Sequence, residues 1–240
     1  NDGYLLKNFI DLGVPCLGIE PSSSTAKISK EKGIDTLIDF FSTKVAKSVV
    51  GKYKNADLII ANNVLAHVPD LLDFLNGIKT LLAEDGMVSI EFPHLLNMIK
   101  NRQFDTIYHE HYSYISLISL NLSLSNIGLK MVDAEEIDVH GGSLRLYISH
   151  KSSKRLTNKI INNIIEKEVK FGLDSIDVYR DFAKDSKKIA LNFLKYFFEK
   201  ADEGCTIVGY GAAAKGNTLL NYCGINSNFI TAVVDETPMK

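Results

Sequence analysis

The sequence predicts an α/β fold: a parallel sheet with helices on both faces that ends in an antiparallel hairpin. Over residues 4–92, short apolar runs alternate with segments whose apolar residues recur at helical spacing, as they do in βαβ units. The run at 57–61 is bounded by polar residues, which is typical of a strand buried on both faces. Residues 129–139 and 143–150 flank Gly141-Gly142, a pair that favours a tight hairpin turn.

The individual elements follow from local signals along the chain. Gly33 closes one helical segment, and Asp85-Gly86 closes a later one. The predicted helices of this part are 4–12, 24–32 and 71–82, and its predicted strands are 14–19, 57–61, 87–92, 129–139 and 143–150.

The rest of the chain predicts a second unit. From about residue 154 to residue 200 the apolar residues follow three- and four-residue steps, so this stretch is predicted to be helical. Gly204 ends it, and a second βαβ start follows, with strands at 206–208 and 229–234 and a helix at 213–222. We therefore predict two domains, 1–153 and 154–240, with the boundary in the helical region.

The composition excludes several classes of function. Lys and Arg number 27 against 29 Asp and Glu, and no basic stripe stands out, which argues against nucleic-acid binding. The apolar runs are too short to cross a bilayer. The three cysteines are far apart and form no CxxC pair, which fits a reducing cytoplasm better than a disulfide framework or a zinc ribbon. The predicted partner is therefore a small molecule, and no membrane or nucleic acid is expected.

Polar residues follow several predicted strands, where an open parallel sheet forms its ligand crevice. Asp2 and Gly3 precede the first helix, and Glu20 ends the next strand. A carboxylate at that place suits the two hydroxyls of a ribose, a device used with both NAD and S-adenosylmethionine. The alternative is a solvated loop glutamate. Asp39 and Phe40 are candidates for holding an adenine, although the aromatic residues there are as well explained by core filling.

The segment from Asn62 to Asp70 is more specific. The polar pair Asn62-Asn63 ends a strand, Val64 begins a short apolar turn, and His67-Val68-Pro69-Asp70 opens a helix. This arrangement resembles class I methyltransferases, in which the segment lies along the methionine and adenosine parts of the cofactor. His67 is assigned no catalytic role, since a loop histidine is often satisfied by its neighbours.

The segment 104–114 has the most unusual composition, with two histidines, a glutamate and three tyrosines within residues 108–114. Three interpretations compete. A metal site would use His109 and His111, but no third ligand follows at suitable spacing, so no metal is predicted. A structural polar network is the second interpretation. The third is an acid–base site, in which a histidine supplies a base near neutral pKa and a tyrosine donates a hydrogen bond to a developing enolate oxygen.

Three motifs in the same order resemble the sugar-nucleotide C-methyltransferase family, whose members methylate carbon 3 of dTDP-4-keto-deoxysugars. The motifs are Tyr108-His109-Glu110-His111-Tyr112-Ser113-Tyr114, His140-Gly141-Gly142-Ser143-Leu144-Arg145 and Gly209-Tyr210-Gly211-Ala212-Ala213-Ala214-Lys215-Gly216-Asn217-Thr218. The resemblance implies a class I methyltransferase domain with a Rossmann-like sheet at 1–153 and a partial second Rossmann-like domain at 154–240. It also implies that a zinc-binding N-terminal domain and the first strand of the sheet are missing.

The same resemblance implies a reaction and its residues. S-adenosylmethionine is the expected cofactor, and a base is expected to form an enolate next to a ketone. His111 is the preferred base, with Tyr108 as hydrogen-bond partner and Glu110 in support, although the motif leaves the base open among the three. His109, Arg145 and Lys215 are candidates for substrate binding, with a structural ion pair as the alternative for Arg145. An NAD-dependent sugar-nucleotide oxidoreductase or epimerase and a non-catalytic truncated domain are the alternative functions.

Overall fold

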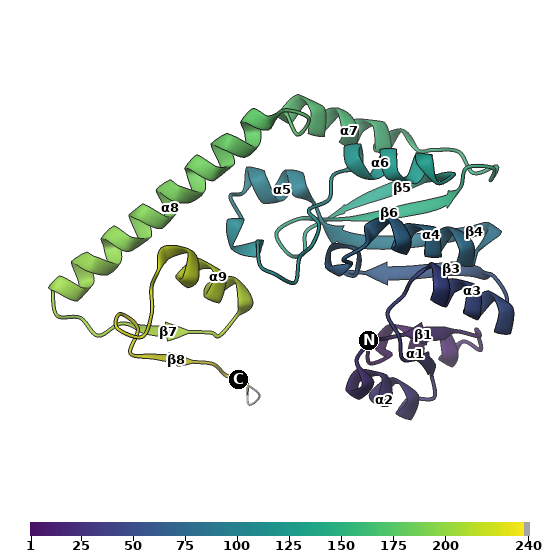
Figure 1. Cartoon of the computed structure of the whole chain (residues 1–240), viewed down its shortest axis with the longest axis horizontal. Coiled ribbons are helices and arrows are strands. Elements are labelled where there is room, and N and C mark those ends of the chain that lie inside the picture. Colours follow the sequence, from purple (N-terminus) through teal and green to yellow (C-terminus); the bar gives the residue numbers. More distant parts are fainter. Residues whose placement is uncertain (238–240) are drawn as a thin grey trace.

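The computed structural model describes residues 1–237 and has a mixed four-stranded sheet at its centre (Figure 1). The strand order is β3 (Ala56–Asn62), β4 (Leu82–Pro93), β6 (Ser143–His150) and β5 (Leu129–Ile137). β4 pairs in parallel with β3 and antiparallel with β6, which in turn pairs antiparallel with β5. The predicted parallel sheet closed by an antiparallel hairpin is therefore confirmed.

A separate two-stranded parallel sheet joins β1 (Leu17–Ile19) to β2 (Asp35–Leu37). No ladder links β1 to β3 within residues 1–237, so each of these strands has one edge without a strand partner. The two sheets are connected through side chains instead. Leu17 and Ile19 of β1 and Ile59 of β3 pack on one buried cluster, which Leu81 forms together with three residues of α3 (Thr43–Lys52).

Most helices of the first part begin at a side-chain cap. Ser22, Ser42, Asp70 and Ser116 each accept a hydrogen bond from a backbone N–H of the turn that follows, which satisfies one of the donors left open at a helix start. The helices are α1 (Tyr4–Asp11), α2 (Ser23–Glu31), α3, α4 (Leu71–Leu81), α5 (Leu95–Lys100) and α6 (Leu117–Asn126). Neither α3 nor α6 is predicted from the sequence. In α6 the Leu-x-Leu repeats have no clear helical period.

The main core lies between the large sheet and the helices that cover it. Phe92, Leu144 and Leu146 are fully buried in β4 and β6. Ile161 and Ile164 of α7 (Lys159–Phe171) enter the same cluster, so α7 is part of this core. Figure 1 shows α6 and α7 along the β5 side of the sheet.

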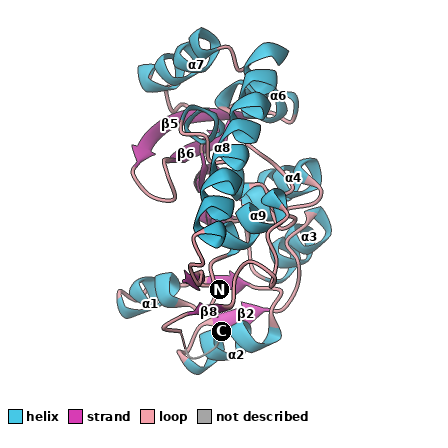
Figure 2. Ribbon diagram, turned by 90° about the vertical axis from the view of Figure 1, so that its left-hand side faces the viewer, coloured by secondary structure: helices cyan, strands magenta, loops and turns pink. Residues whose placement is uncertain are grey.

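The predicted helical region is divided into α7 and the long helix α8 (Ile176–Asp202). Gly172, with φ of 94°, adopts the left-handed conformation that ends α7 and favours glycine. α8 then runs away from the large sheet as one long helix (Figures 1 and 2). The predicted helical stretch is confirmed over α7 and α8, and the break between them at Gly172 is a feature that helical periodicity does not predict.

The chain ends in a small βαβ unit. β7 (Val208–Tyr210) and β8 (Ala232–Val234) pair in parallel, and α9 (Ala214–Cys223) connects them. The ring of Tyr222 on α9 lies 5.1 Å from that of Phe104, which brings this unit back to the first part of the chain. The division between 153 and 154 and the second Rossmann-like domain stay predictions, and residues 238–240 lie outside the described residues.

No helix within the described part of the chain is long and apolar enough to cross a membrane.

The buried hairpin strand β6 offers a test of the core. Leu146→Ala removes a side chain with no exposed surface, so it should lower the free energy of unfolding by about 2–5 kcal/mol. Leu122→Ala on α6 is the matched control, because that side chain is 65% exposed and its loss should change the stability by less than about 0.5 kcal/mol. Urea unfolding followed by circular dichroism measures both, and equal effects would contradict the described packing.

Candidate active site

The segment that carries the histidine and tyrosine cluster is a loop tied to the end of β3. It begins at the short helix η2 (Phe104–Thr106) and turns at 108–111, where the N–H of His111 donates to the carbonyl of Tyr108. The N–H groups of Tyr112 and Ser113 both donate to the carbonyl of Ala66, at 2.8 and 3.2 Å. Ala66 belongs to the helical turn η1 (Leu65–His67), so the two segments singled out in the sequence are joined directly.

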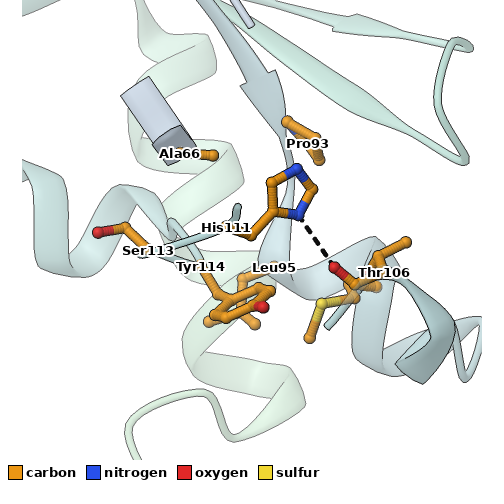
Figure 3. Close-up of a pocket in the computed structure, with 8 residues that line it drawn as sticks. Ala66, Pro93, Leu95, Thr106, His111, Ser113 and Tyr114 are labelled. Carbon is orange, nitrogen blue, oxygen red and sulfur yellow. Dashed lines mark hydrogen bonds between the residues drawn. The ribbon is translucent and has the colours of Figure 1, made fainter. Parts of the chain in front are cut away.

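The hydrogen bonds of His111 determine which ring nitrogen carries the proton. Its Nδ1 lies 3.0 Å from the carbonyl oxygen of Thr106, which only accepts, so Nδ1 is the donor (Figure 3). In the neutral ring Nε2 is therefore an acceptor, and the hydroxyl of Tyr108 donates to it over 3.2 Å. The phenol O–H of Tyr108 is thus directed at the basic lone pair of His111.

The surroundings keep both groups neutral. Burial lowers the pKa of His111, and the charges of His67 and Lys215 lower it further, against the opposing effects of the Thr106 carbonyl and Glu110. Burial, with a smaller effect from Glu110, raises the pKa of Tyr108. Near neutral pH the imidazole is therefore unprotonated and able to accept a proton, while the phenol keeps its own.

A small cavity of about 20 Å³ adjoins His111, enough for one water molecule. Pro93, Leu95 and Met98 give it apolar walls, and Tyr114 closes it from the returning loop. Figure 3 shows the His111 ring between Pro93 and Thr106. The apolar walls explain the desolvation that lowers the pKa of this histidine.

His67 belongs to the same cluster, although no catalytic role is predicted for it from the sequence. Its ring centre lies 4.8 Å from that of His111, and its Nδ1 donates to the carbonyl of Glu110 over 2.9 Å. The signal that was available is its position five residues after Asn62, at the end of a strand. The side chains of His109 and Glu110 are exposed beside this cluster, as is Lys215 on α9.

The end of β3 presents polar atoms toward the neighbouring strand. Asn63 adopts the left-handed conformation with φ of 54°, which asparagine tolerates well, and its Nδ2 donates to Glu91 over 3.4 Å. The Oδ1 of Asn62 is buried and has no hydrogen-bond partner within residues 1–237. A buried acceptor without a donor is costly, so this atom points to a bound group. Val64 is exposed next to it.

Arg145 already has two carboxylate partners. One guanidinium nitrogen lies 2.9 Å from Glu91 and another 3.6 Å from Glu135, and the hydrogen bond to Glu91 raises the pKa of Arg145. This arrangement favours the structural ion pair over the predicted contact with substrate, because the buried Glu91 needs a cation.

The predicted cofactor residues of the smaller sheet lie apart from the cavity at His111. Glu20 follows β1, pairs with the amino group of Asn1 and accepts a hydrogen bond from the N–H of Ser22. Asp2 pairs with Lys32 over 2.7 Å. Neither Glu20 nor Asn62 lines the cavity beside His111, so the structure does not bring these groups into one small pocket.

Gly3 and the pair Asp39-Phe40 have local explanations as well. Gly3 is buried with φ of 81°, a conformation that favours glycine, and an added Cβ would meet the side chains of Ile34 and Ser29. Asp39 accepts a hydrogen bond from the N–H of Phe40, whose ring is 75% exposed. The adjacent Phe41 packs edge-on against Phe74 in the core.

Comparison with known proteins connects this geometry to a family. Residues 1–134 match the family model described as a methyltransferase domain, and residues 138–240 match the C-methyltransferase C-terminal domain. The chain is 32% identical over all of its 240 residues to the C-methyltransferase NovU of Streptomyces niveus, and it spans 57% of the length of that relative.

A solved structure supports the fold. The chain is similar to the complex of a Haloferax volcanii methyltransferase activator with its methyltransferase, with a TM-score of 0.50 and 13% identity over 62% of this chain and 78% of the other. The match to a methyltransferase domain favours S-adenosylmethionine over NAD as the cofactor. The chain therefore belongs to the methyltransferase-domain family, and its second part is similar to the C-methyltransferase C-terminal domain.

Proposed function

We propose that this chain is the catalytic core of an S-adenosylmethionine-dependent C-methyltransferase that acts on the carbon next to a ketone in a nucleotide-linked deoxysugar. One observation carries the proposal. The Thr106 carbonyl holds the proton of His111 on Nδ1, which leaves Nε2 as a base beside the Tyr108 hydroxyl. Removing a proton from the carbon next to a ketone requires a base, and a hydrogen-bond donor stabilises the enolate oxygen that forms.

The strand ends fit the methyl donor that a methyltransferase domain implies. Asn62 offers a buried acceptor oxygen without a partner, which suits an N–H or ammonium group of the methionine part. Glu20, at the carboxyl end of β1, offers a carboxylate for ribose hydroxyls, with Asp39 and Phe40 as candidates for the adenine. Asp2, Gly3, Asn63 and Val64 complete the predicted set of cofactor residues.

In the proposed reaction Nε2 of His111 removes the proton from the carbon beside the ketone. The Tyr108 hydroxyl then donates to the oxygen that becomes negative, and Glu110 stands nearby to balance the imidazolium that forms. The apolar walls of Pro93, Leu95 and Met98 limit the water that reaches the His111 ring. S-adenosylmethionine supplies, when bound, the activated methyl group that the enolate carbon accepts.

Support for a nucleotide-linked substrate comes from the three motifs and from the charge at the site. Lys215 is close enough to lower the pKa of His111, and it is exposed on the first turn of α9. A cation there suits a substrate phosphate, and His109 lies exposed on the same loop. Arg145 is a weaker candidate, because Glu91 and Glu135 already occupy its guanidinium.

His111→Ala should lower methyl transfer by about 10²–10⁴-fold, the usual contribution of a placed base, and leave the Kd for S-adenosylmethionine unchanged. Transfer of a labelled methyl group to a panel of 4-keto-deoxysugar nucleotides measures the first quantity, and calorimetry measures the second. His140→Asn is the control, because His140 is exposed in the hairpin turn with φ of 53°, a conformation that asparagine accepts. Full turnover in His111→Ala would show that the base is another residue.

Lys215→Ala should raise the pKa of His111, because the lysine charge disfavours the imidazolium. Proton-detected titration of the histidine side chains by NMR measures this pKa, and the His111 signal is identified by its absence in His111→Ala. Lys187→Ala, which removes an exposed charge from α8, should leave the His111 pKa unchanged. An unchanged pKa in Lys215→Ala would remove α9 from the electrostatics of the site.

Glu20→Ala should weaken S-adenosylmethionine binding by about tenfold or more, as expected for a lost hydrogen bond to a charged group. Glu31→Ala, an exposed carboxylate on the neighbouring helix α2, is the matched control. Calorimetry with S-adenosylmethionine and with NAD on the same samples decides between the cofactors, and binding of NAD alone would support the oxidoreductase alternative.

A further inference from the structure

Glu168 is a buried carboxylate on α7 that contacts the segments on either side of the loop of the candidate active site. Its side chain has no exposed surface, and it accepts three hydrogen bonds. One comes from Nε2 of His94 at 2.7 Å, and the others come from the N–H groups of Leu117 at 2.7 Å and Ile118 at 2.9 Å. The carboxylate therefore connects two segments that lie on either side of His111 in the sequence.

The two segments joined by Glu168 are also hydrogen-bonded to each other. The N–H of Leu95 donates to the carbonyl of Ile115 over 3.0 Å, and His94 and Ile115 form a parallel bridge. The N–H of His94 donates in addition to the carbonyl of Gly142 in the hairpin turn. Since Pro93 and Leu95 line the cavity beside His111, a shift of His94 changes the wall of that cavity.

The contacts of Glu168 also provide hydrogen-bond acceptors for the backbone N–H groups at the start of α6. Ser116 accepts from the N–H of Ser119, which leaves the N–H groups of Leu117 and Ile118 for Glu168. A carboxylate at a helix N-terminus is favoured by the helix dipole as well as by these bonds. A buried carboxylate is costly in free energy unless hydrogen-bond donors replace its hydration. The three donors around Glu168 provide this compensation.

His94 contributes a donor and leaves a buried acceptor. Its Nε2–H donates the hydrogen bond to Glu168. Its Nδ1 is buried without a hydrogen-bond partner in the part of the chain that the structure describes. Core packing alone would be served better by an apolar side chain at this position. The pair is therefore best explained by the precise location it gives to the chain between β4 and α5.

We propose that Glu168 is a positioning residue for the candidate active site, holding the loop that carries His111 in place through His94 and the start of α6. The role rests on the proposed function, since it assigns His111 the part of the base. It makes α7, which follows the hairpin, a required support of the site rather than a linker.

Glu168→Gln tests this role with almost no change in shape. The amide keeps one acceptor oxygen but turns the other position into a donor that faces an N–H group. We expect kcat to fall by about 10- to 100-fold with an unchanged Kd for S-adenosylmethionine, because displacement of a catalytic group by about 1 Å has this effect. Glu166→Gln is the matched control, since Glu166 is exposed on the same helix.

A second readout separates positioning from general stability. The His111 ring is surrounded by Tyr108 and Glu110 of its own loop, His67 of η1 and Lys215 of α9. A displaced loop admits water, so the pKa of His111 in folded Glu168→Gln should rise toward its ordinary value. NMR titration of the histidine side chains measures this pKa without any turnover.

The variants of His94 provide an independent arm if Glu168→Gln does not fold. His94→Gln keeps a donor that reaches Glu168 and should behave nearly as the parent chain, whereas His94→Leu removes the donor and should show the same changes as Glu168→Gln. A folded Glu168→Gln or His94→Leu with the kcat and His111 pKa of the parent chain overturns the proposal. If the parent chain transfers no methyl group, the proposed function fails, while the titration still decides whether Glu168 positions the loop.

Discussion

The pairing of β4 on both of its edges is the constraint on which the rest of the site depends. β3 occupies one edge and β6 the other, so the last residues of β4 have little freedom. Glu91 is held there between Asn63, which follows β3, and Arg145 on β6. The chain then continues through Pro93 and His94 into contacts with the loop that carries His111. The position of His111 therefore depends on the strand pairing at the centre of the sheet.

The sequence was most informative where a pattern is local. The glycine pair at 141–142 and the apolar run at 57–61 identify the hairpin and a buried strand because their signals lie within a few residues. The cluster at 108–111 stood out for the same reason, since core packing does not require polar rings so close together. The structure brings the Tyr108 hydroxyl to 3.2 Å from Nε2 of His111, and the catalytic roles of the two residues stay predictions.

The sequence was least informative where function depends on contacts between distant segments. His67 and His111 are neighbours only because the loop hydrogen-bonds to Ala66. Glu168 looks like any charged residue of a surface helix, and its partner His94 lies 74 positions away. Helical periodicity likewise cannot show that α7 packs into the first core while α8 leaves it. Such features require the fold, because no short pattern encodes them.

The bond between His111 and Thr106 has an evolutionary consequence. The acceptor is a main-chain oxygen, which every amino acid possesses, so replacing the side chain at position 106 does not delete it. The tautomer of His111 is therefore determined by the backbone conformation of residues 106–111 rather than by the side chain at position 106. A change at that position acts on the tautomer only through the shape of the turn, to which the Thr106 hydroxyl contributes by donating to the carbonyl of Gln103, whereas an insertion or deletion between 106 and 111 would move the acceptor away from Nδ1.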